Sequence, residues 1–456
     1  MNPLLFTDPA FLFCFAPIVL TLYYVIPPTW RNPYLLACSL ILYVWGESKN
    51  SGTLLLSIAM NYACGLRIKP GQRLPLILGV SANLILLAVF KYPAFIVTNI
   101  NVIVPHPLPV PKIALPVGLS FFTFMAISYL VDIFRQQTGP ERNPITFGTY
   151  LAMFPHLIAG PIVRFQDLAA QLHNRTVTAV DITQGIRLFV IGLGKKVLIG
   201  NTVAVPADAI FALPTDQLST PIAWIGAICY TVQIYFDFSG YSDMAIGLAR
   251  MLGFHFLENF RHPYISQSIT EFWRRWHISL SSWLRDYLYL PLQSRSPGLR
   301  SRNTLIVFLL CGLWHGSAWH FVFWGLYHGL FRILERTHFR GHLEAAPAAF
   351  RHAYTLLVVI GGWVLFRAGT LPAAGSYLLA MAGLGHAPLA DPQPQRYLTL
   401  DVVIALLFGV AASAPSSTSL RSLHPAVQFA ALAAMFVTAL ALTSAQTYNP
   451  FIYFRF

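Results

Sequence analysis

Hydrophobic residues along this chain fall in long runs that short polar connections separate. A membrane-spanning helix needs roughly 20 apolar residues. Runs of that length or close to it lie near residues 10–27, 33–48, 74–90, 93–111, 113–131, 186–212, 220–236, 303–331, 352–366, 399–414 and 425–443. Shorter or interrupted runs lie near 52–65, 146–163, 241–256 and 371–384. The pattern predicts an all-α polytopic membrane protein with about eleven transmembrane helices plus re-entrant or interfacial helices. Residues 1–456 are expected to form a single integral membrane domain.

The composition agrees with this class of protein. Of the 456 residues, 56% are hydrophobic and 10% are charged, whereas a soluble protein carries about 25% charged residues. The net charge of +13 comes mostly from Lys and Arg between apolar runs, where they set topology rather than bind nucleic acid. The basic clusters at residues 67–73 and 295–302 are therefore expected in the cytoplasm. The five cysteines follow no metal-ligand spacing and imply no disulfide framework. The first apolar run lacks a preceding basic segment and is expected to be a retained span.

The run 303–331, NTLIVFLLCGLWHGSAWHFVFWGLYHGLF, contains three histidines, His315, His320 and His328. As one helix it would extend roughly 44 Å at 1.5 Å per residue, which is too long for a single span. Gly312 and Gly316 flank the LWHG sequence, so we expect a broken helix that lines a cavity around His315. An ionisable group at membrane depth is a functional-site hypothesis by default. On a regular helix His320 and His328 point away from His315, and helix–helix hydrogen bonding is expected to account for them.

A second informative segment, 271–292, reads EFWRRWHISLSSWLRDYLYLPL. Its spacing predicts one amphipathic helix whose apolar face contains Trp273, Trp276, Leu280, Trp283, Leu284 and Tyr287. His277 is expected on or beside that face, where it is either a hydrogen-bonded core histidine or a functional one. The basic side would face lipid headgroups or an anionic ligand.

A buried neutral histidine such as His315 or His277 can act as a general base. A neutral histidine can remove the proton of a hydroxyl group as that group attacks a thioester. Cys311 precedes His315 by four residues, so a Cys–His nucleophilic dyad is a second option beside a thiol that only packs. A haem or metal site is the competing use of buried histidines, although this sequence does not display matched pairs clearly.

Two further segments interrupt apolar sequence with polar residues. In 235–249, YFDFSGYSDMAIGLA, Ser239 or Ser242 is expected to cap a following helix with Asp243 in its first turn. The alternative is that Asp237 or Asp243 orients a catalytic histidine or pairs with a buried arginine. In 154–164, FPHLIAGPIVR, a structural turn is the favoured interpretation.

Together these segments resemble the membrane-bound O-acyltransferase family, above all the bacterial branch that acetylates alginate and other exopolysaccharides and D-alanylates teichoic acids. The likeness runs over nearly the whole chain. Its residues are FWRRWHISL (272–280), LRDY (284–287), LWHG (313–316), FDFSGYSDMAIG (236–247), FPHLIAGPIVR, WVLFRA (363–368) and the closing PFIYFRF (450–456). His320 departs from the family's pattern.

The resemblance implies a ring of helices around a central tunnel or funnel. It implies that His315 is the principal catalytic histidine and that His277 is the second functional position. Residues expected to bind the donor or support the site are Trp314, Arg274, Ser279, Arg285, Asp286 and Asp237. No metal or permanently bound cofactor is expected. The donor would be acetyl-coenzyme A or another acyl thioester, on coenzyme A or an acyl carrier protein, reaching the site from the cytoplasm.

The implied partners are a polysaccharide acceptor on the opposite side and a separate periplasmic or extracellular GDSL-like acetyltransferase, in a multi-pass protein of the bacterial inner membrane. A high content of Ala, Pro and Arg favours a Gram-negative source and hence acetyl transfer to an exopolysaccharide. Two alternatives stay open. One is D-alanyl or other acyl transfer from a carrier protein to a cell-wall polymer, and the other is a lipid or polysaccharide transporter without chemistry.

Overall fold

The computed structural model describes residues 6–337, 339–385, 393–415 and 424–445, and within these ranges it contains helices and no strand. The chain forms two compact units. The first comprises Met1–Phe189 and Tyr241–Glu258, and the second comprises Val190–Gly240 and Asn259–Phe456. The prediction of one integrated membrane domain stays a prediction.

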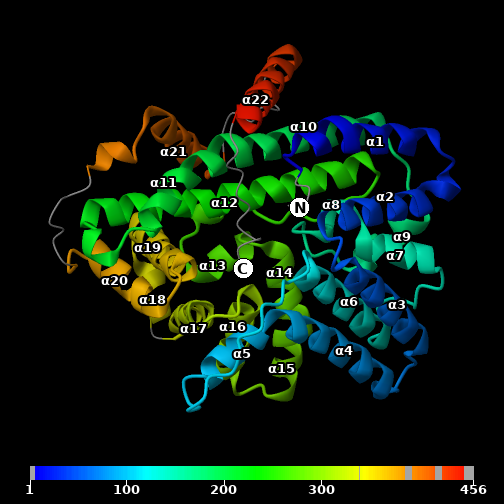
Figure 1. Cartoon of the computed structure of the whole chain (residues 1–456), viewed down its shortest axis with the longest axis horizontal. Coiled ribbons are helices and arrows are strands. Elements are labelled where there is room, and N and C mark those ends of the chain that lie inside the picture. The colour runs from blue at the N-terminus through cyan, green and yellow to red at the C-terminus, as the bar shows by residue number, and fades with distance from the viewer. Residues whose placement is uncertain (1–5, 338, 386–392, 416–423, 446–456) are drawn as a thin grey trace. The chain divides into compact units, whose positions relative to one another are not determined.

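The first unit is built around one buried helix. Its helices are η1 (Phe11–Phe15), α1 (Ala16–Val25), α2 (Arg31–Gly46), α3 (Ser51–Arg67), α4 (Arg73–Lys91), α5 (Pro93–Ile100), α6 (Leu119–Phe134), α7 (Pro144–Ala152), α8 (Phe154–Leu157) and α9 (Phe165–His173), with parts of α10 and α12. Nearly every residue of α6 is buried, and α3, α4, α7 and α9 pack against it. Figure 1 shows α3, α4 and α6 side by side.

One predicted span in this unit is wrong. The apolar run 93–111 forms only the eight-residue helix α5, which ends at Ile100, and no helix follows until Leu119. Pro105, Pro107, Pro109 and Pro111 alternate through the intervening residues. Proline lacks the backbone N–H that a helix needs, so this apolar stretch continues as a loop.

Apart from short 3₁₀ turns, the second unit contains the remaining helices of the described residues. They are α10 (Ala179–Gly194), η3 (Lys195–Asn201), α11 (Thr202–Phe211), α12 (Thr220–Met251), α13 (Ile269–Arg275), α14 (Ile278–Leu284), η6 (Arg285–Tyr289), α15 (Leu290–Arg295), α16 (Arg300–His315), α17 (Trp319–Leu334), α18 (Phe339–Ala345), α19 (Ala348–Arg367), α20 (Leu371–Met381), α21 (Leu400–Ala412) and α22 (Pro425–Ala445). By residue number, α10 begins and α12 ends in the first unit.

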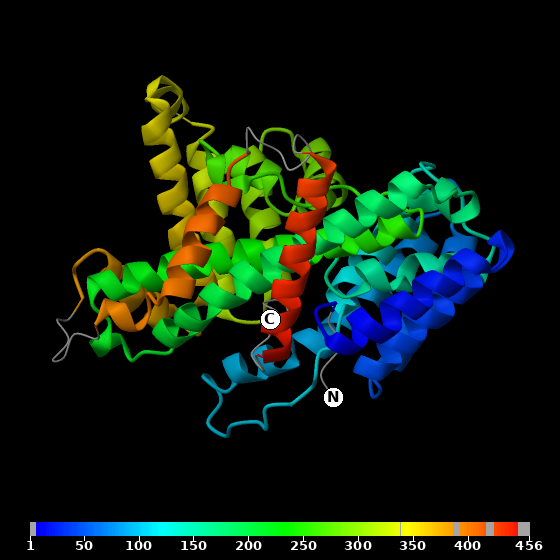
Figure 2. The ribbon, with the colours of Figure 1, turned by 90° about the horizontal axis from the view of Figure 1, so that it is seen from above.

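Four helical segments are long and apolar enough to cross a membrane: Arg73–Lys91, Ala179–Phe211, Ala348–Arg367 and Pro425–Ala445. Within α22, drawn red in Figures 1 and 2, Ala439 alone is buried. An apolar helix that exposes almost its whole surface fits a lipid surrounding. The chain is therefore a helical membrane protein, but the expected count of about eleven spans is not confirmed.

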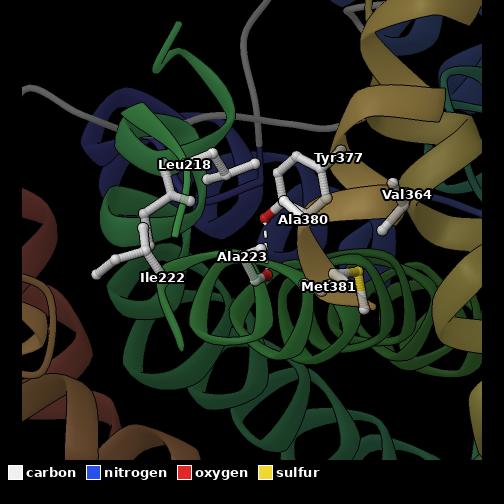
Figure 3. Close-up of a cluster of buried hydrophobic side chains, with 9 residues drawn as sticks. Leu218, Ile222, Ala223, Val364, Tyr377, Ala380 and Met381 are labelled. Atoms are coloured by element: carbon white, nitrogen blue, oxygen red, sulfur yellow. Dashed lines mark hydrogen bonds between the residues drawn. The ribbon is translucent and has the colours of Figure 1, made fainter. Parts of the chain in front are cut away.

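A hydrophobic cluster fixes α19 and α20 against α12 in the second unit. Its buried residues are Ile210, Leu218, Ile222, Ala223, Ala227, Val364, Tyr377, Ala380 and Met381. The Tyr377 hydroxyl crosses the cluster and donates to the Ala223 carbonyl at 2.9 Å (Figure 3). This packing holds the end of α19, where Phe366 contacts the site described below.

The helices α16 and α17 form a tightly packed antiparallel hairpin. A Cβ atom added at Gly312 would lie 2.2 Å from the Phe321 carbonyl oxygen, and one added at Gly325 would lie 2.2 Å from the Phe308 carbonyl oxygen. Glycine is therefore required at both positions for the two backbones to approach so closely. The predicted break at LWHG is confirmed, because α16 ends at His315 and α17 begins at Trp319.

Candidate active site

The segment 271–292 does not form the single amphipathic helix that its spacing predicts. The helix α13 ends at Arg275, Trp276 is extended, and His277 adopts a left-handed conformation with φ of +43°. A new helix, α14, begins at Ile278 and continues into the π-helical turn η6. The amphipathic-helix prediction is wrong because a left-handed residue interrupts the helical backbone, although His277 is buried as expected.

The start of α13 is fastened to the end of α17. The Ser268 hydroxyl accepts a hydrogen bond from the Glu271 N–H at 3.0 Å. The Glu335 carboxylate accepts from the N–H groups of Ile269 and Thr270, at 2.5 and 2.8 Å. A carboxylate at a helix N-terminus satisfies free N–H groups and complements the helix dipole. The bonds to Glu335 hold the first turn of α13 against the end of α17.

His277 is completely buried within the second unit. Its ring meets Phe238 edge-on with centroids 4.7 Å apart, and it lies 6.4 Å from the Trp314 ring. Its Nδ1 lies 3.2 Å from Asn259 Oδ1. The residue stands outside the four candidate membrane-spanning segments, and burial lowers the pKa of its imidazole to about 3. His277 is therefore neutral at physiological pH.

His315 is the last residue of α16 and is also buried. Its ring is edge-on to Trp314 at 4.9 Å, to Trp324 at 5.0 Å and to Phe366 at 5.3 Å, measured between centroids. Trp314 thus contacts both imidazoles. The structure brings the predicted pair together around this one indole ring.

The other two histidines of the run occupy different surroundings. His328 is fully buried among the rings of Phe272, Trp273 and Trp324. Neither of its ring nitrogens has a hydrogen-bond partner within the described part of the chain, so the prediction of helix–helix hydrogen bonding is wrong for His328. The aromatic faces that surround it explain this, since they offer packing and no strong acceptor. His320 lies against the ring of Phe321 at 4.1 Å.

A cavity of about 420 Å³ opens beside this aromatic cluster. The α16 residues Thr304, Val307, Phe308 and Cys311 form one wall, at the spacing of a single helix face. Trp273, Ile278, Ser281 and Ser282 belong to the opposite segment, α13–α14. The cavity reaches Cys311, one helical turn before His315; a cavity around His315 itself stays a prediction.

The cavity is strongly basic. Arg274, Arg285, Arg332 and Arg336 all line it. Arg285 pairs with Asp286 at 2.6 Å, and Arg336 donates to the Thr304 hydroxyl at 3.0 Å. Among the described residues, no carboxylate lies within ion-pair distance of the guanidinium groups of Arg274, Arg332 and Arg336. Planar guanidinium groups suit phosphate and carboxylate ligands, so the cavity fits an anion.

The predicted supporting residues lie in three places. Arg274 and Arg285 line the cavity, with Asp286 paired to Arg285. Ser279 joins the hydrogen bonds around His277, with its Oγ 3.4 Å from Nδ1. Trp314 contacts both histidine rings. Sequence reasoning missed Asn259, Arg332 and Arg336, although the i, i+4 spacing of the two arginines near the end of α17 offered a signal.

Asp237 forms a buried ion pair with Lys196, where the sequence suggested a catalytic histidine or a buried arginine. The capping prediction for Ser239, Ser242 and Asp243 is wrong, because α12 runs through this region without interruption from Thr220 to Met251. Gly240 allows this helix to pass close to the Gly192 carbonyl and to Lys196.

Three further segments carry the family resemblance: 154–164, 363–368 and 450–456. The structure describes the first two of them. The predicted turn in FPHLIAGPIVR is confirmed in the first unit, where α8 ends at Leu157 and buried His156 lies with its Nε2 2.9 Å from the Tyr150 carbonyl oxygen. WVLFRA places Phe366 against His315. The closing PFIYFRF, 450–456, lies outside the described residues.

Comparison with known proteins identifies relatives of this chain. The sequence model of the membrane-bound O-acyltransferase family matches residues 120–369. The "Probable alginate O-acetylase AlgI" of Pseudomonas putida is 42% identical, over 99% of this chain and 100% of the relative. The peptidoglycan O-acetyltransferase of Helicobacter pylori is 35% identical, over 85% of this chain and 81% of the relative. The teichoic acid D-alanyltransferase of Bacillus subtilis is 30% identical, over 50% of this chain and 60% of the relative.

Proposed function

The chain belongs to the membrane-bound O-acyltransferase family and is an O-acyltransferase, and we propose that it moves an acetyl group from a cytoplasmic thioester toward an extracellular polysaccharide. The names of its relatives support acetyl as the group transferred. The match to the acetylating relative covers 99% of this chain, whereas the match to the D-alanylating relative covers 50% of it. We place the protein in the bacterial inner membrane, where shorter apolar helices cross the bilayer in addition to the four long ones.

The pairing of His315 and His277 around Trp314 is the observation that carries the proposed mechanism. His315 acts as the general base and takes the proton of an acceptor hydroxyl group. The hydroxyl oxygen attacks the thioester carbonyl carbon, and the tetrahedral intermediate collapses with cleavage of the C–S bond. The imidazolium of His315 returns its proton to the departing thiolate. The products are an O-acyl ester and a free thiol, and His277 positions the donor or the acceptor.

The basic cavity supports a donor that carries phosphate. Coenzyme A and the phosphopantetheine arm of a carrier protein both combine a thioester with phosphate groups. We propose that Arg274, Arg332 and Arg336 bind those phosphates while the thioester reaches past Cys311 toward His315. Bidentate arginine contacts orient such a ligand as well as hold it, which is what transfer to a fixed base requires.

The acceptor is proposed to be a sugar hydroxyl of an exopolysaccharide or a hydroxyl of a periplasmic GDSL-like partner that modifies the polymer afterwards. Transfer of D-alanyl or another acyl group from a carrier protein to a cell-wall polymer uses the same chemistry. A transporter without chemistry would move its substrate and leave the thioester intact.

The test compares His315→Ala with His320→Ala, the same substitution in the same hairpin. Each variant is inserted in membranes, its folding is checked by thermal unfolding, and free thiol release from acetyl-coenzyme A is measured together with the acetyl content of the polymer. We expect His315→Ala to lose about 10²- to 10⁴-fold in transfer rate and His320→Ala to stay within about threefold of the wild type. A folded His315→Ala variant that acetylates normally would refute the proposal, and substrate movement without thiol release would establish a transporter.

A further inference from the structure

We propose that Asn259 is a positioning residue that holds His277 as the Nδ1–H tautomer and thereby presents Nε2 as a hydrogen-bond acceptor. Three groups converge on the side-chain oxygen of Asn259: Ser279 N at 3.2 Å, Ser279 Oγ at 2.9 Å and His277 Nδ1 at 3.2 Å. All three residues are buried. The inference rests on the proposed function, because it gives His277 a defined protonation state in the same reaction.

The backbone of Ser279 fixes which way the Asn259 amide points. A backbone N–H can only donate, so the atom that it meets must be an acceptor. If the amide were flipped, its NH₂ group would face this N–H and would also face the imidazole. The oxygen of the Asn259 amide therefore lies toward His277. Oxygen and nitrogen of an amide look alike in outline, and here the hydrogen bonds distinguish them.

The orientation of the amide decides the tautomer of the imidazole. An oxygen that only accepts hydrogen bonds favours a proton on the facing nitrogen, so Nδ1 carries the hydrogen of the neutral ring. The lone pair then lies on Nε2, and this atom can accept a proton or hydrogen bond from a hydroxyl, thiol or amide of a substrate. Control of the tautomer by a fixed partner on the other nitrogen is a general property of functional histidines.

Asn259 also supports the backbone at His277. Its main-chain carbonyl accepts from the Ile278 N–H at 2.9 Å, so one residue satisfies the first two N–H groups of α14. A left-handed conformation at a non-glycine residue costs about 1–3 kcal/mol and persists only where neighbouring contacts impose it. The main-chain contact to Ile278 survives any substitution of the Asn259 side chain, whereas the hydrogen bond from the Ser279 N–H depends on the side-chain oxygen.

The first experiment follows the imidazole ¹⁵N chemical shifts of His277 against pH for the wild type and Asn259→Asp in the full chain. A carboxylate at this position still accepts the three hydrogen bonds, but its charge favours the imidazolium and raises the pKa of His277 by about one to three units. His277 should therefore become protonated at a pH higher by about one to three units than in the wild type. Acyl transfer alone would not report this change, because protonation of the base His315 also stops the reaction. Asn303→Asp is the matched control, since Asn303 is buried in the same unit and lies about 18 Å along α16 from His315. In that variant His277 should become protonated at the same pH as in the wild type.

The inference would be overturned by ¹⁵N shifts that place the proton of neutral His277 on Nε2, or by protonation of His277 at the same pH in Asn259→Asp and the wild type. Should the carboxylate variant fail to fold, Asn259→Ala removes the side-chain oxygen and keeps the main-chain cap. Its kcat should fall about 10- to 100-fold with the KM for the donor within about threefold, and an unchanged kcat would equally overturn the inference. These outcomes are separate from failure of the proposed function, which would appear as a wild type without thiol release or as an active His315→Ala variant.

Discussion

Replacing Gly312 with alanine tests whether the close contact between α16 and α17 holds His315 in place. The new Cβ atom would lie 2.2 Å from the Phe321 carbonyl oxygen, whereas an ordinary van der Waals contact of a Cβ atom begins at about 3.4 Å. The obstacle is a backbone atom, so it cannot rotate away as a flexible side chain would. The two helices would have to separate by more than about 1 Å.

The magnitude follows from two opposing effects. Overpacking of this kind costs about 1–3 kcal/mol, and the rigid backbone places Gly312→Ala at the upper end. Alanine recovers about 1 kcal/mol of helix propensity, which leaves a net loss of about 2 kcal/mol in the free energy of unfolding. A displacement of about 1 Å at the end of α16 is also expected to reduce acyl transfer about 10²-fold.

The assay combines unfolding in detergent with thiol release from acetyl-coenzyme A. Gly375→Ala is the matched control, because Gly375 stands inside α20 and a Cβ atom there would meet nothing within 4 Å. That variant should gain up to about 1 kcal/mol and keep its activity. If Gly312→Ala proves as stable and active as the wild type, the hairpin contact does not position His315 and the reasoning fails.

Two further predictions concern the cavity. Cys311→Ala should retain turnover within about twofold, because a mechanism with His315 as base needs no covalent intermediate on sulfur; a loss of 100-fold or more in a folded variant would instead support the Cys–His dyad. Arg332→Gln should raise the KM for acetyl-coenzyme A about 10- to 100-fold, as loss of a charged hydrogen bond worth about 1.5–3 kcal/mol implies. The exposed Arg340, paired with Glu344 at 2.8 Å, is the control position, and equal KM values for Arg332→Gln and Arg340→Gln would exclude the phosphate-binding role.

The sequence predicts the broken helix at LWHG because its signals are local. Gly312 and Gly316 flank the break, and the apolar run is too long for a single span. Prolines in the run 93–111 offered an equally local signal against a span there, and hydrophobicity alone obscured it. Periodicity reports which residues are apolar, but not whether each residue can donate its backbone hydrogen bond.

The break at His277 depends on a distant residue, so the segment 271–292 could not reveal it. The tryptophan spacing is compatible with a continuous helix, and the contacts that favour a restart at Ile278 come from Asn259, 19 residues earlier. The ion-pair partner of Asp237 could not be predicted for the same reason, since Lys196 lies 41 residues away in sequence. Residue chemistry identified the two histidines, whereas the groups that orient them became visible only in the folded chain.

The aromatic cluster around the histidines has a practical consequence for measurement. Five of the chain's ten tryptophans, Trp273, Trp276, Trp314, Trp324 and Trp363, form a connected set of ring contacts with each other and with the two histidines. Indole emission responds to the polarity around the ring, and a neighbouring imidazolium quenches it more strongly than a neutral imidazole does. Half of the chain's tryptophans therefore belong to the aromatic cluster that contains the two histidines. Entry of a donor, or a change in the charge of His277, should be visible as a change in emission without any attached label.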